Sequence, residues 1–436
     1  MKNYPHHHAK NVLPGRHFRK IKDTYLAKIS SHLSKVYFLL FFLLCSVLAR
    51  ILALPNTSAF LIMSIALYLA FSKDILPKNK RQSYLLLGLL FLIFIAISRK
   101  IADYHIAFAY MPVTGLILLV AIIYNDLKLS FVISVLAACF SGIIANNSLP
   151  MCLIFLITGI ITALLARKVR TRIRVLVAGI CAGIVQALLF WLTYGESNPS
   201  SILPNLLNGS MCAIAVTGVL PLLENLFGIV TNISLLELAD FNHPLLKKMV
   251  IETPGTHLHS LIVGNLAEAA AESIGANSLL ARIGAYYHDI GKLSNPEYFV
   301  ENQKASSKHL HLSPSMSKMV IMNHIKEGMD LAKKYRLKPA IIDFILQHHG
   351  TSLVYYFYRK ALEEGEGLEA IHEEGFRYPG PRPASKETAI VLLADSVEAA
   401  CRVLTDPQPA KIEEVVHKVI NNKFIDGQLD DCELTL

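Results

Sequence analysis

Apolar runs of nearly membrane-spanning length recur through the N-terminal half of the chain, and they constrain its fold more than any other feature. A helix crosses a bilayer core with about 20 apolar residues, and about 17 suffice where flanking side chains reach the interface. The runs cover residues 36–54, 56–72, 84–98, 106–124, 129–145, 151–166, 173–194 and 206–229. Although the second, third and sixth runs are short, we expect a polytopic helical membrane domain of about 8 spans over residues 36–230.

Basic residues are unevenly distributed, and their positions predict how the spans are oriented. Residues 1–230 hold 21 Lys and Arg against 6 Asp and Glu, whereas residues 231–436 hold 21 against 27. The net charge of +9 therefore arises in the apolar half, which disfavours a compact nucleic-acid binder, so that no nucleic acid is expected as a partner. Cytoplasmic loops are enriched in Lys and Arg, and such residues cluster in 1–35, 73–83 and 167–172. The lipid bilayer of the cell (inner) membrane is the expected partner, with both termini in the cytoplasm.

Residues 1–35 form a basic cytoplasmic N-terminal segment in this interpretation, and their 35 polar and basic residues argue against a cleaved signal peptide. Within the spans, Gln186 is a notable polar residue, and Gly179 with Gly183 forms a small-xxx-small pair that lets two helices approach closely. The seven cysteines include no Cys-x-x-Cys pair, which argues against a disulfide framework and a zinc ribbon. The spans therefore resemble an anchor or a sensor.

From about Thr231 the sequence changes to helical periodicity with polar faces, punctuated by Pro and Gly. No strand-like alternation of any length occurs, so a cytoplasmic all-helical domain is expected over residues 231–436. Its helices are expected at 235–250, 256–275, 278–290, 314–335, 339–349, 352–364, 386–404 and 410–421. The predicted fold class is therefore all-α for the whole chain.

Eleven of the 17 histidines lie in this second domain, and several occupy settings that require a partner. His288 and Asp289 end an apolar helix, and Asp395 follows the apolar run Ile390–Ala394, where an unpaired carboxylate is costly to bury. Adjacent helical residues point about 100° apart, which suits an imidazole on one ion and a carboxylate that bridges to a second. The candidate metal ligands are His259, His288, Asp289, His324, His348, His349 and Asp395.

Imidazoles and carboxylates without thiolates favour Fe or Mn, with Zn as a third option, over a cysteine-based structural zinc site. Each of these histidines, taken alone, is more often a satisfied core residue than a ligand, so the ordered set carries the prediction. Seven ligands exceed the needs of one tetrahedral ion but suit two divalent metal ions bridged by Asp289. Two ions can activate a water and clamp the oxygens of a phosphodiester. Lys292 would then lie near the phosphate as a point charge, so Asp289 and Lys292 are the candidate catalytic residues.

Six stretches of the chain resemble the membrane-anchored HD-domain phosphohydrolases, known as the seven-transmembrane HD hydrolases, and most closely their PgpH-type cyclic di-AMP phosphodiesterases. The stretches are Pro254–Leu261, Asn265–Ala270, Ala285–Lys292, Gln347–Thr351, Tyr378–Pro381 and Leu393–Ala399. The resemblance implies a cyclic dinucleotide substrate, cyclic di-AMP, which is hydrolysed to linear pApA at a site with two Mn or Fe ions. It also implies the same seven ligands, with Asp289 as the bridge.

The resemblance has one large gap. Family members usually carry a large extracytoplasmic domain after the first span, whereas only Leu54–Ser58 separates the first two expected spans here. Signal reception from outside is therefore not expected of this chain.

Two other functions stay open on the sequence alone. An HD-type hydrolase could act on another nucleotide phosphate ester, because the metal ligands fix the chemistry but not the base. A membrane receptor could instead bind a nucleotide without turnover, although the complete ligand set argues against this. Tyr286, Tyr298 and Tyr378 are candidates for stacking on a base, with core packing as the competing role. The sequence also leaves a homo-oligomer open.

Overall fold

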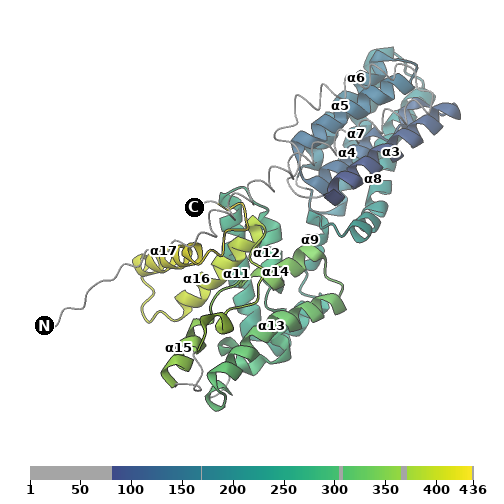
Figure 1. Ribbon diagram of the computed structural model, residues 1–436. Coiled ribbons are helices and arrows are strands. Elements are labelled where there is room, and N and C mark those ends of the chain that lie inside the picture. The colour runs from purple at the N-terminus through teal and green to yellow at the C-terminus, as the bar shows by residue number, and fades with distance from the viewer. Residues whose placement is uncertain (1–80, 168, 304–307, 365–370, 435–436) are drawn as a thin grey trace. The chain divides into compact units, whose positions relative to one another are not determined.

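A computed structural model describes residues 81–167, 169–303, 308–364 and 371–434, and every regular element in these ranges is helical. The isolated β-bridge within them joins Leu353 and Arg377. The prediction of an all-α chain is therefore confirmed. The chain separates into two compact units, Met1–Leu222 and Leu223–Leu436, which we describe individually (Figure 1). The expected spans at 36–54 and 56–72, the segment 1–35 and the short loop between the two spans lie outside the described residues.

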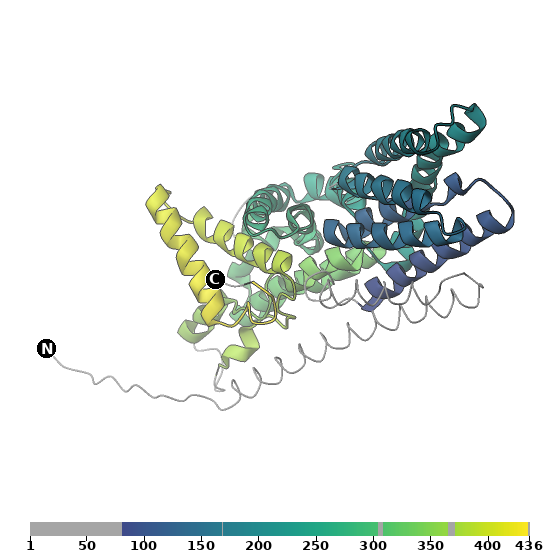
Figure 2. The same cartoon turned by 90° about the horizontal axis from the view of Figure 1, so that it is seen from above.

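The described part of the first unit is a bundle of apolar helices that run alongside one another (Figure 2). Five of its helices are long and apolar enough to cross a membrane, and a shorter apolar stretch covers Phe108–Tyr124. These helices overlap the six expected spans that fall on described residues, which fits a multi-pass membrane protein. The elements are α3 (Arg81–Asp103), η1 (Phe108–Tyr110), α4 (Val113–Tyr124), α5 (Leu127–Ile144), α6 (Leu149–Ala166), α7 (Arg172–Tyr194) and α8 (Pro199–Phe227), of which α8 continues into the second unit.

Short polar side chains set the helix starts in this apolar bundle. The first backbone N–H groups of a helix have no partner within the helix, and a side-chain oxygen before the first turn can accept from them. Asp126 accepts from the N–H of Lys128 at 2.8 Å and so begins α5, and Ser148 accepts from the N–H of Met151 and begins α6. The two helices pack against each other.

Glycines bring α7 and α8 into close contact. A Cβ atom added at Gly183 would lie 2.2 Å from the backbone oxygen of Leu206, and one at Gly209 would lie 2.0 Å from that of Gly179. Since any larger side chain would force the backbones apart, the expected role of Gly179 and Gly183 in helix approach is confirmed.

Three buried amides lie beside this contact and satisfy one another. Gln186 Nε2 donates to the carbonyl of Ala109 at 2.9 Å and to Asn205 Oδ1 at 3.1 Å. Asn208 Nδ2 donates to Gln186 Oε1 at 3.0 Å and to the carbonyl of Met111 at 3.3 Å. The network joins α7 and α8 to the residues around η1, so the polar groups of the bundle hold helices together.

The second unit is also helical. Its α-helices are α9 (Asn232–Leu238), α10 (Pro244–Glu252), α11 (Pro254–Ser273), α12 (Ser278–Tyr287), α13 (Pro314–Lys334), α14 (Pro339–Gln347), α15 (Tyr355–Glu364), α16 (Lys386–Arg402) and α17 (Pro409–Ile425). Short 3-10 helices connect them at η2 (Ile290–Ser294), η3 (Pro296–Tyr298), η4 (Val300–Asn302), η5 (Lys308–His311) and η6 (Glu373–Phe376). In both views α17 lies beside α16, at the yellow end of the colour scale (Figures 1 and 2).

One predicted helix of this unit is wrong. The stretch expected as a single helix over 235–250 forms α9 and α10, separated by the turn at 239–243. Pro244 is the first residue of α10, where its missing N–H costs nothing, but it could not continue a helix from α9. The predicted end of the last helix at residue 421 is also short, because α17 continues to Ile425.

The core of the second unit positions the helices that carry the candidate site. Val263 of α11, Ala285 of α12, Phe344 of α14 and Val391 of α16 are fully or almost fully buried in one cluster. Burying a side chain as large as leucine or phenylalanine contributes roughly 1.5–3 kcal/mol, so this cluster holds the four helices firmly. Gly284 leaves room for the Phe344 ring, because an added Cβ atom would lie 2.4 Å from it.

Candidate metal centre

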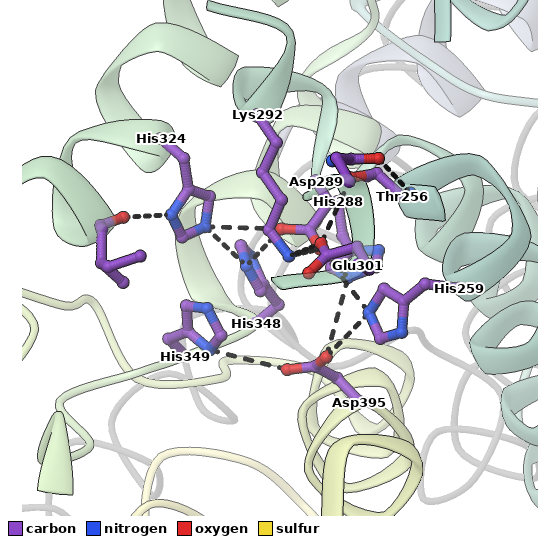
Figure 3. Close-up of polar contacts among 12 residues, drawn as sticks. Thr256, His259, His288, Asp289, Lys292, Glu301, His324, His348, His349 and Asp395 are labelled. Carbon is purple, nitrogen blue, oxygen red and sulfur yellow. Dashed lines mark hydrogen bonds and ion pairs between the residues drawn. The ribbon is translucent and has the colours of Figure 1, made fainter. Parts of the chain in front are cut away.

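The seven candidate ligands, distant in sequence, lie together in the second unit (Figure 3). The cluster draws on α11, α13 and α16 and on the residues that follow α12 and α14. Six of the seven are buried, and the His349 side chain is 22% exposed. The structure thus brings together every residue that the sequence analysis chose as a ligand: His259, His288, Asp289, His324, His348, His349 and Asp395.

Asp289 lies at the centre of the cluster, and its two carboxylate oxygens face different imidazoles. Oδ2 is 3.1 Å from His288 Nε2 and 3.5 Å from His259 Nε2. Oδ1 is 3.5 Å from His324 Nε2 and 3.6 Å from His348 Nε2. A carboxylate in this position can bridge two cations, one on each side.

The potential ligand atoms also fall into two groups. His259, His288 and Asp289 offer atoms within 4.8 Å of one another, and His324, His348 and His349 do the same. Asp395 lies between them: Oδ1 is 3.1 Å from His259 Nε2, and Oδ2 is 3.6 Å from His349 Nδ1. Two separate groups with carboxylates between them match the requirements of two ions better than those of one.

The local sequence explains how Asp289 reaches this position. α12 ends at Tyr287, His288 keeps helical backbone angles, and Asp289 leaves the helix with φ −109° and ψ 16°. The chain then turns into η2, where Gly291 packs so closely on α13 that an added Cβ atom would lie 1.8 Å from the carbonyl oxygen of His324. Glycine at this position therefore lets the two segments and their ligands meet.

Backbone carbonyls orient the imidazole rings. The Nδ1–H groups of His288 and His324 donate to the carbonyls of Ala285 and Ile321, each at 2.6 Å, and His348 Nδ1–H donates to Phe344 at 3.0 Å. With the proton on Nδ1, each ring turns the lone pair of Nε2 toward the centre, as metal-binding histidines do.

Several buried polar atoms at the centre have no hydrogen-bond partner. Among the described residues, these include Nε2 of His259, Nε2 of His288 and Oδ1 of Asp289. Buried polar atoms are rarely left unpaired, because the loss of hydration costs free energy. Nitrogen and carboxylate oxygen are common donors for Mn, Fe and Zn, so the residues fit a pair of divalent metal ions.

Burial and charge shift the pKa values of these ligands in opposite directions. Burial alone disfavours a charged His259, but Asp395 and Glu398 outweigh it and raise the pKa of His259 to about 9. The neighbouring carboxylates thus favour a positive charge here, which a proton or a metal ion can supply. Burial lowers the pKa of His324 to about 4, which keeps this imidazole neutral and able to bind a metal. Burial also opposes charge on Asp289, yet His288 and Lys292 lower its pKa well below the usual range.

Comparison with known proteins identifies the family of this chain. The family described as "7TM receptor with intracellular HD hydrolase" matches residues 48–231, and the HD domain family matches residues 256–400. The chain belongs to the seven-transmembrane HD hydrolases. His288 and Asp289 form the adjacent His-Asp pair of its HD domain.

Two curated relatives are similar to this HD hydrolase over most of its length. It is 38% identical over 377 residues to the cyclic-di-AMP phosphodiesterase PgpH of Bacillus subtilis (strain 168), covering 82% of this chain and 53% of that protein. It is 37% identical over 390 residues to the PgpH of Listeria monocytogenes serotype 1/2a (strain 10403S), covering 85% and 53%. The chain thus spans about half the length of these relatives.

Crystal structures of the HD domain of L. monocytogenes PgpH are also similar, at 49% identity without ligand and 48% in complex with cyclic-di-AMP. Each covers 45% of this chain and 91% of the crystallised one, with TM-scores of 0.42 and 0.43.

Lys292, which the sequence analysis expects beside the phosphate, lies next to Asp289, and two acids share its charge. Its Nζ is 2.7 Å from Asp289 Oδ2 and 2.7 Å from Glu301 Oε1. Burial opposes the charge of Lys292, but these two carboxylates outweigh it and raise the pKa of the ammonium group. Glu301 also accepts a hydrogen bond from Thr256 Oγ1 at 3.2 Å, which ties Lys292 to the start of α11.

Sequence reasoning missed two acids that support the site. Glu398 Oε2 accepts from His259 Nδ1–H at 2.7 Å, and Arg402 in turn donates to both oxygens of Glu398. Glu398 lies one helical turn after Asp395, and this spacing could have indicated it. Glu301 follows η3 in a segment without helical periodicity, so no pattern could have indicated it.

The three aromatic candidates for base stacking have packing partners. Tyr286 and Tyr378 are buried, and Tyr378 stacks on His349 with ring centroids 4.4 Å apart. Tyr298 contacts His309, which packs against Phe357 and lies outside both ligand groups.

Proposed function

We propose that this chain is an integral-membrane, metal-dependent phosphodiesterase that hydrolyses cyclic di-AMP to linear pApA. The observation that carries the proposal is the position of Asp289 between two groups of buried imidazoles, in one of which the Nε2 atoms of His259 and His288 have no hydrogen-bond partner. The curated relatives of the same family, at 37% and 38% identity, are named as cyclic-di-AMP phosphodiesterases, which supports this choice of substrate.

The ligand groups assign the residues that would hold the metal ions. His259, His288 and Asp395 would hold one ion, His324, His348 and His349 the other, and Asp289 would bridge them. Mn or Fe suits these nitrogen and oxygen ligands. Two divalent ions, when bound, supply the activation of water and the neutralisation of phosphate charge that hydrolysis of a phosphodiester needs.

The remaining residues orient the reaction. In hydrolysis, water oxygen bonds to phosphorus, the ester oxygen leaves and gains a proton, and the ring opens to a linear dinucleotide with a terminal phosphate. Lys292 holds a positive charge beside Asp289, where it can stabilise the negative charge that develops on the phosphate. Glu301 and Glu398 keep Lys292 and His259 in place.

The membrane domain, residues 36–230, anchors this site in the bilayer of the cell membrane, and residues 231–436 form the HD domain. The HD domain faces the cytoplasm in this proposal, because the loops 73–83 and 167–172, which the expected order of spans puts on the same side as the HD domain, are rich in Lys and Arg. A cytoplasmic site would meet a nucleotide second messenger directly.

The test uses the full chain in detergent or nanodiscs, loaded with Mn or Fe. Cyclic di-AMP, cyclic di-GMP, pApA and (p)ppGpp are assayed side by side, and cyclic di-AMP is expected to be hydrolysed fastest. Faster hydrolysis of (p)ppGpp or another ester would favour an HD hydrolase of a different nucleotide. Binding of cyclic di-AMP without turnover, in a metal-loaded chain, would favour a receptor.

A further inference from the structure

A lysine outside the residues matched by the HD family contacts the loop that follows the candidate ligand His349. Lys423 belongs to the last turns of α17, whereas the family match ends at residue 400. Its Nζ donates a hydrogen bond of 2.7 Å to Ser352 Oγ, and the lysine is half-buried. The N–H of Ser352 donates to the carbonyl of His349 at 3.1 Å, so one hydroxyl-bearing residue connects Lys423 with a candidate ligand.

The end of the chain is fixed against this same loop. Gln428 Oε1 accepts from the N–H of Thr351 at 2.8 Å, and its Nε2 donates to Thr351 Oγ1 at 3.0 Å. An added Cβ atom at Gly350 would lie 2.3 Å from Gln428 Oε1, which shows how closely the two segments pack. The position of Lys423 next to the residues after His349 is therefore built into the fold.

Lys423 forms no ion pair with any carboxylate of the described residues. Its hydrogen-bond partner there is the neutral hydroxyl of Ser352. The nearest acid in sequence, Asp426, is bound by both terminal nitrogens of Arg377, at 2.8 and 3.1 Å. Burial lowers the pKa of Lys423, and the negative charges of Asp395 and Asp426 partly counteract this shift.

A half-buried ammonium beside a hydrolytic centre, with a hydroxyl as its partner, suits an anion that arrives with the substrate. A cyclic dinucleotide carries two phosphodiester groups. While one lies at the metal pair, the other needs a compensating charge, and Lys292 is already shared by Asp289 and Glu301. Lys423, beside the loop that follows His349, can supply that charge.

We propose that Lys423 binds the second, unreacted phosphate of a dinucleotide, and that it makes the site prefer two-phosphate ligands over ligands with one phosphate. This inference rests on the proposed function, because it assumes that one phosphate occupies the metal centre. It assigns to the C-terminal helix a role in the choice of substrate.

The experiment compares Lys423→Met with Lys418→Met in the full chain, in nanodiscs and loaded with Mn. Lys418 lies on α17 as well but is exposed, so its substitution controls for the loss of one charge. Dissociation constants are measured for pApA, which has two phosphates, and for AMP, which has one. Manganese content is measured in every variant.

The expected result is that Lys423→Met weakens binding of pApA by about tenfold or more, the effect of one charge-assisted hydrogen bond. Binding of AMP, manganese content and the Lys418→Met variant stay within about twofold of the wild type, and Lys423→Arg recovers part of the affinity for pApA. The role of Lys423 would be overturned if Lys423→Met weakened the binding of pApA and AMP equally or weakened neither. A wild type that binds neither ligand would also overturn it.

Turnover of cyclic di-AMP by the same wild-type preparation separates the two proposals. If cyclic di-AMP is not hydrolysed but Lys423→Met still loses affinity for pApA selectively, the proposed function is wrong and the second phosphate site stands. If cyclic di-AMP is hydrolysed but Lys423→Met shows no selective loss of affinity for pApA, the proposed function stands and the role of Lys423 is wrong.

Discussion

In the first unit the buried amides of Gln186, Asn205 and Asn208 bond to one another and to backbone carbonyls, whereas in the second unit buried nitrogens of His259 and His288 have no hydrogen bond. Both sets connect helices that are distant in sequence. The amides find hydrogen-bond partners within the bundle and so hold its helices together. The two imidazole nitrogens lack such partners, which predicts a ligand from outside the chain.

Unpaired polar atoms also occur in the first unit, and they differ in kind. Among its described residues, the hydroxyl oxygens of Ser98, Thr114 and Thr158 are buried without a hydrogen bond, one on each of α3, α4 and α6. In the second unit the residues with unpaired atoms, His259, His288 and Asp289, are imidazoles and a carboxylate that offer ligand atoms within 4.8 Å of one another. The convergence of potential metal ligands, in addition to the lack of a partner, therefore marks the candidate site.

The largest effect is expected for Asp289→Asn, which removes the charge between the two ligand groups. The amide cannot bridge two cations, so we expect the loss of at least one metal ion per chain. Turnover of cyclic di-AMP should fall by about a thousandfold or more, equivalent to roughly 4 kcal/mol in the barrier. The exposed Asp330→Asn on α13 is the matched control. Wild-type rate and metal content in Asp289→Asn would remove the bridge from the mechanism.

Glu398→Gln tests whether the orientation of His259 matters. Its carboxylate accepts the Nδ1–H of His259, and loss of such a partner typically weakens metal binding about 10–100-fold. Competition with a chelator measures the affinity for Mn. Glu413→Gln, an exposed substitution on α17, is expected to leave the affinity unchanged. Equal affinities of both variants would show that His259 needs no support from Glu398.

In the first unit, Gly209→Ala and Gly218→Ala form a matched pair on α8. A Cβ atom at Gly209 would lie 2.0 Å from the backbone of Gly179, whereas one at Gly218 meets nothing within 4 Å. Gly209→Ala should therefore lower the free energy of unfolding by about 1–3 kcal/mol, and Gly218→Ala should not. Unfolding in detergent measures both, and metal content should be unchanged in each. Similar stabilities would contradict the close contact of α7 with α8.

The smallest effect is expected for Gln186→Leu, which removes the hydrogen bonds of Gln186 to Asn205 and Asn208. Hydrogen bonds between helices in membranes contribute on average about 0.6 kcal/mol and at most about 1.7 kcal/mol, so we expect a modest loss of stability. Thr193→Val on the same helix removes an exposed hydroxyl as a control. Loss of metal in Gln186→Leu would show that the amides do more than hold helices together.

The sequence analysis picked out seven candidate ligands that the fold brings together, because each stands out locally as a histidine or aspartate in an apolar setting. The expected spans on described residues also matched helices, because apolar length is a local property. The bond between His259 and Glu398 joins residues 139 apart, and only the packing of α11 on α16 creates it. Pro244 could have indicated that 235–250 is divided into two helices, but the apolar periodicity across it favoured one continuous helix.

The position of Lys423 could not be predicted from the sequence either, because it too depends on tertiary packing. Its partner Ser352 is 71 residues away, and a single lysine in a helix has no pattern that marks it as part of a site. Composition and periodicity locate helices and candidate ligands. They do not reveal which charges the fold leaves without a partner.

Metal content of the purified full chain tests the two-ion centre most directly. Elemental analysis after saturation with Mn should give two ions per chain in the wild type, and one ion in His259→Ala and in His324→Ala, which each disrupt one ligand group. A wild type that binds one ion or none, or variants that both keep two, would contradict a metal pair bridged by Asp289.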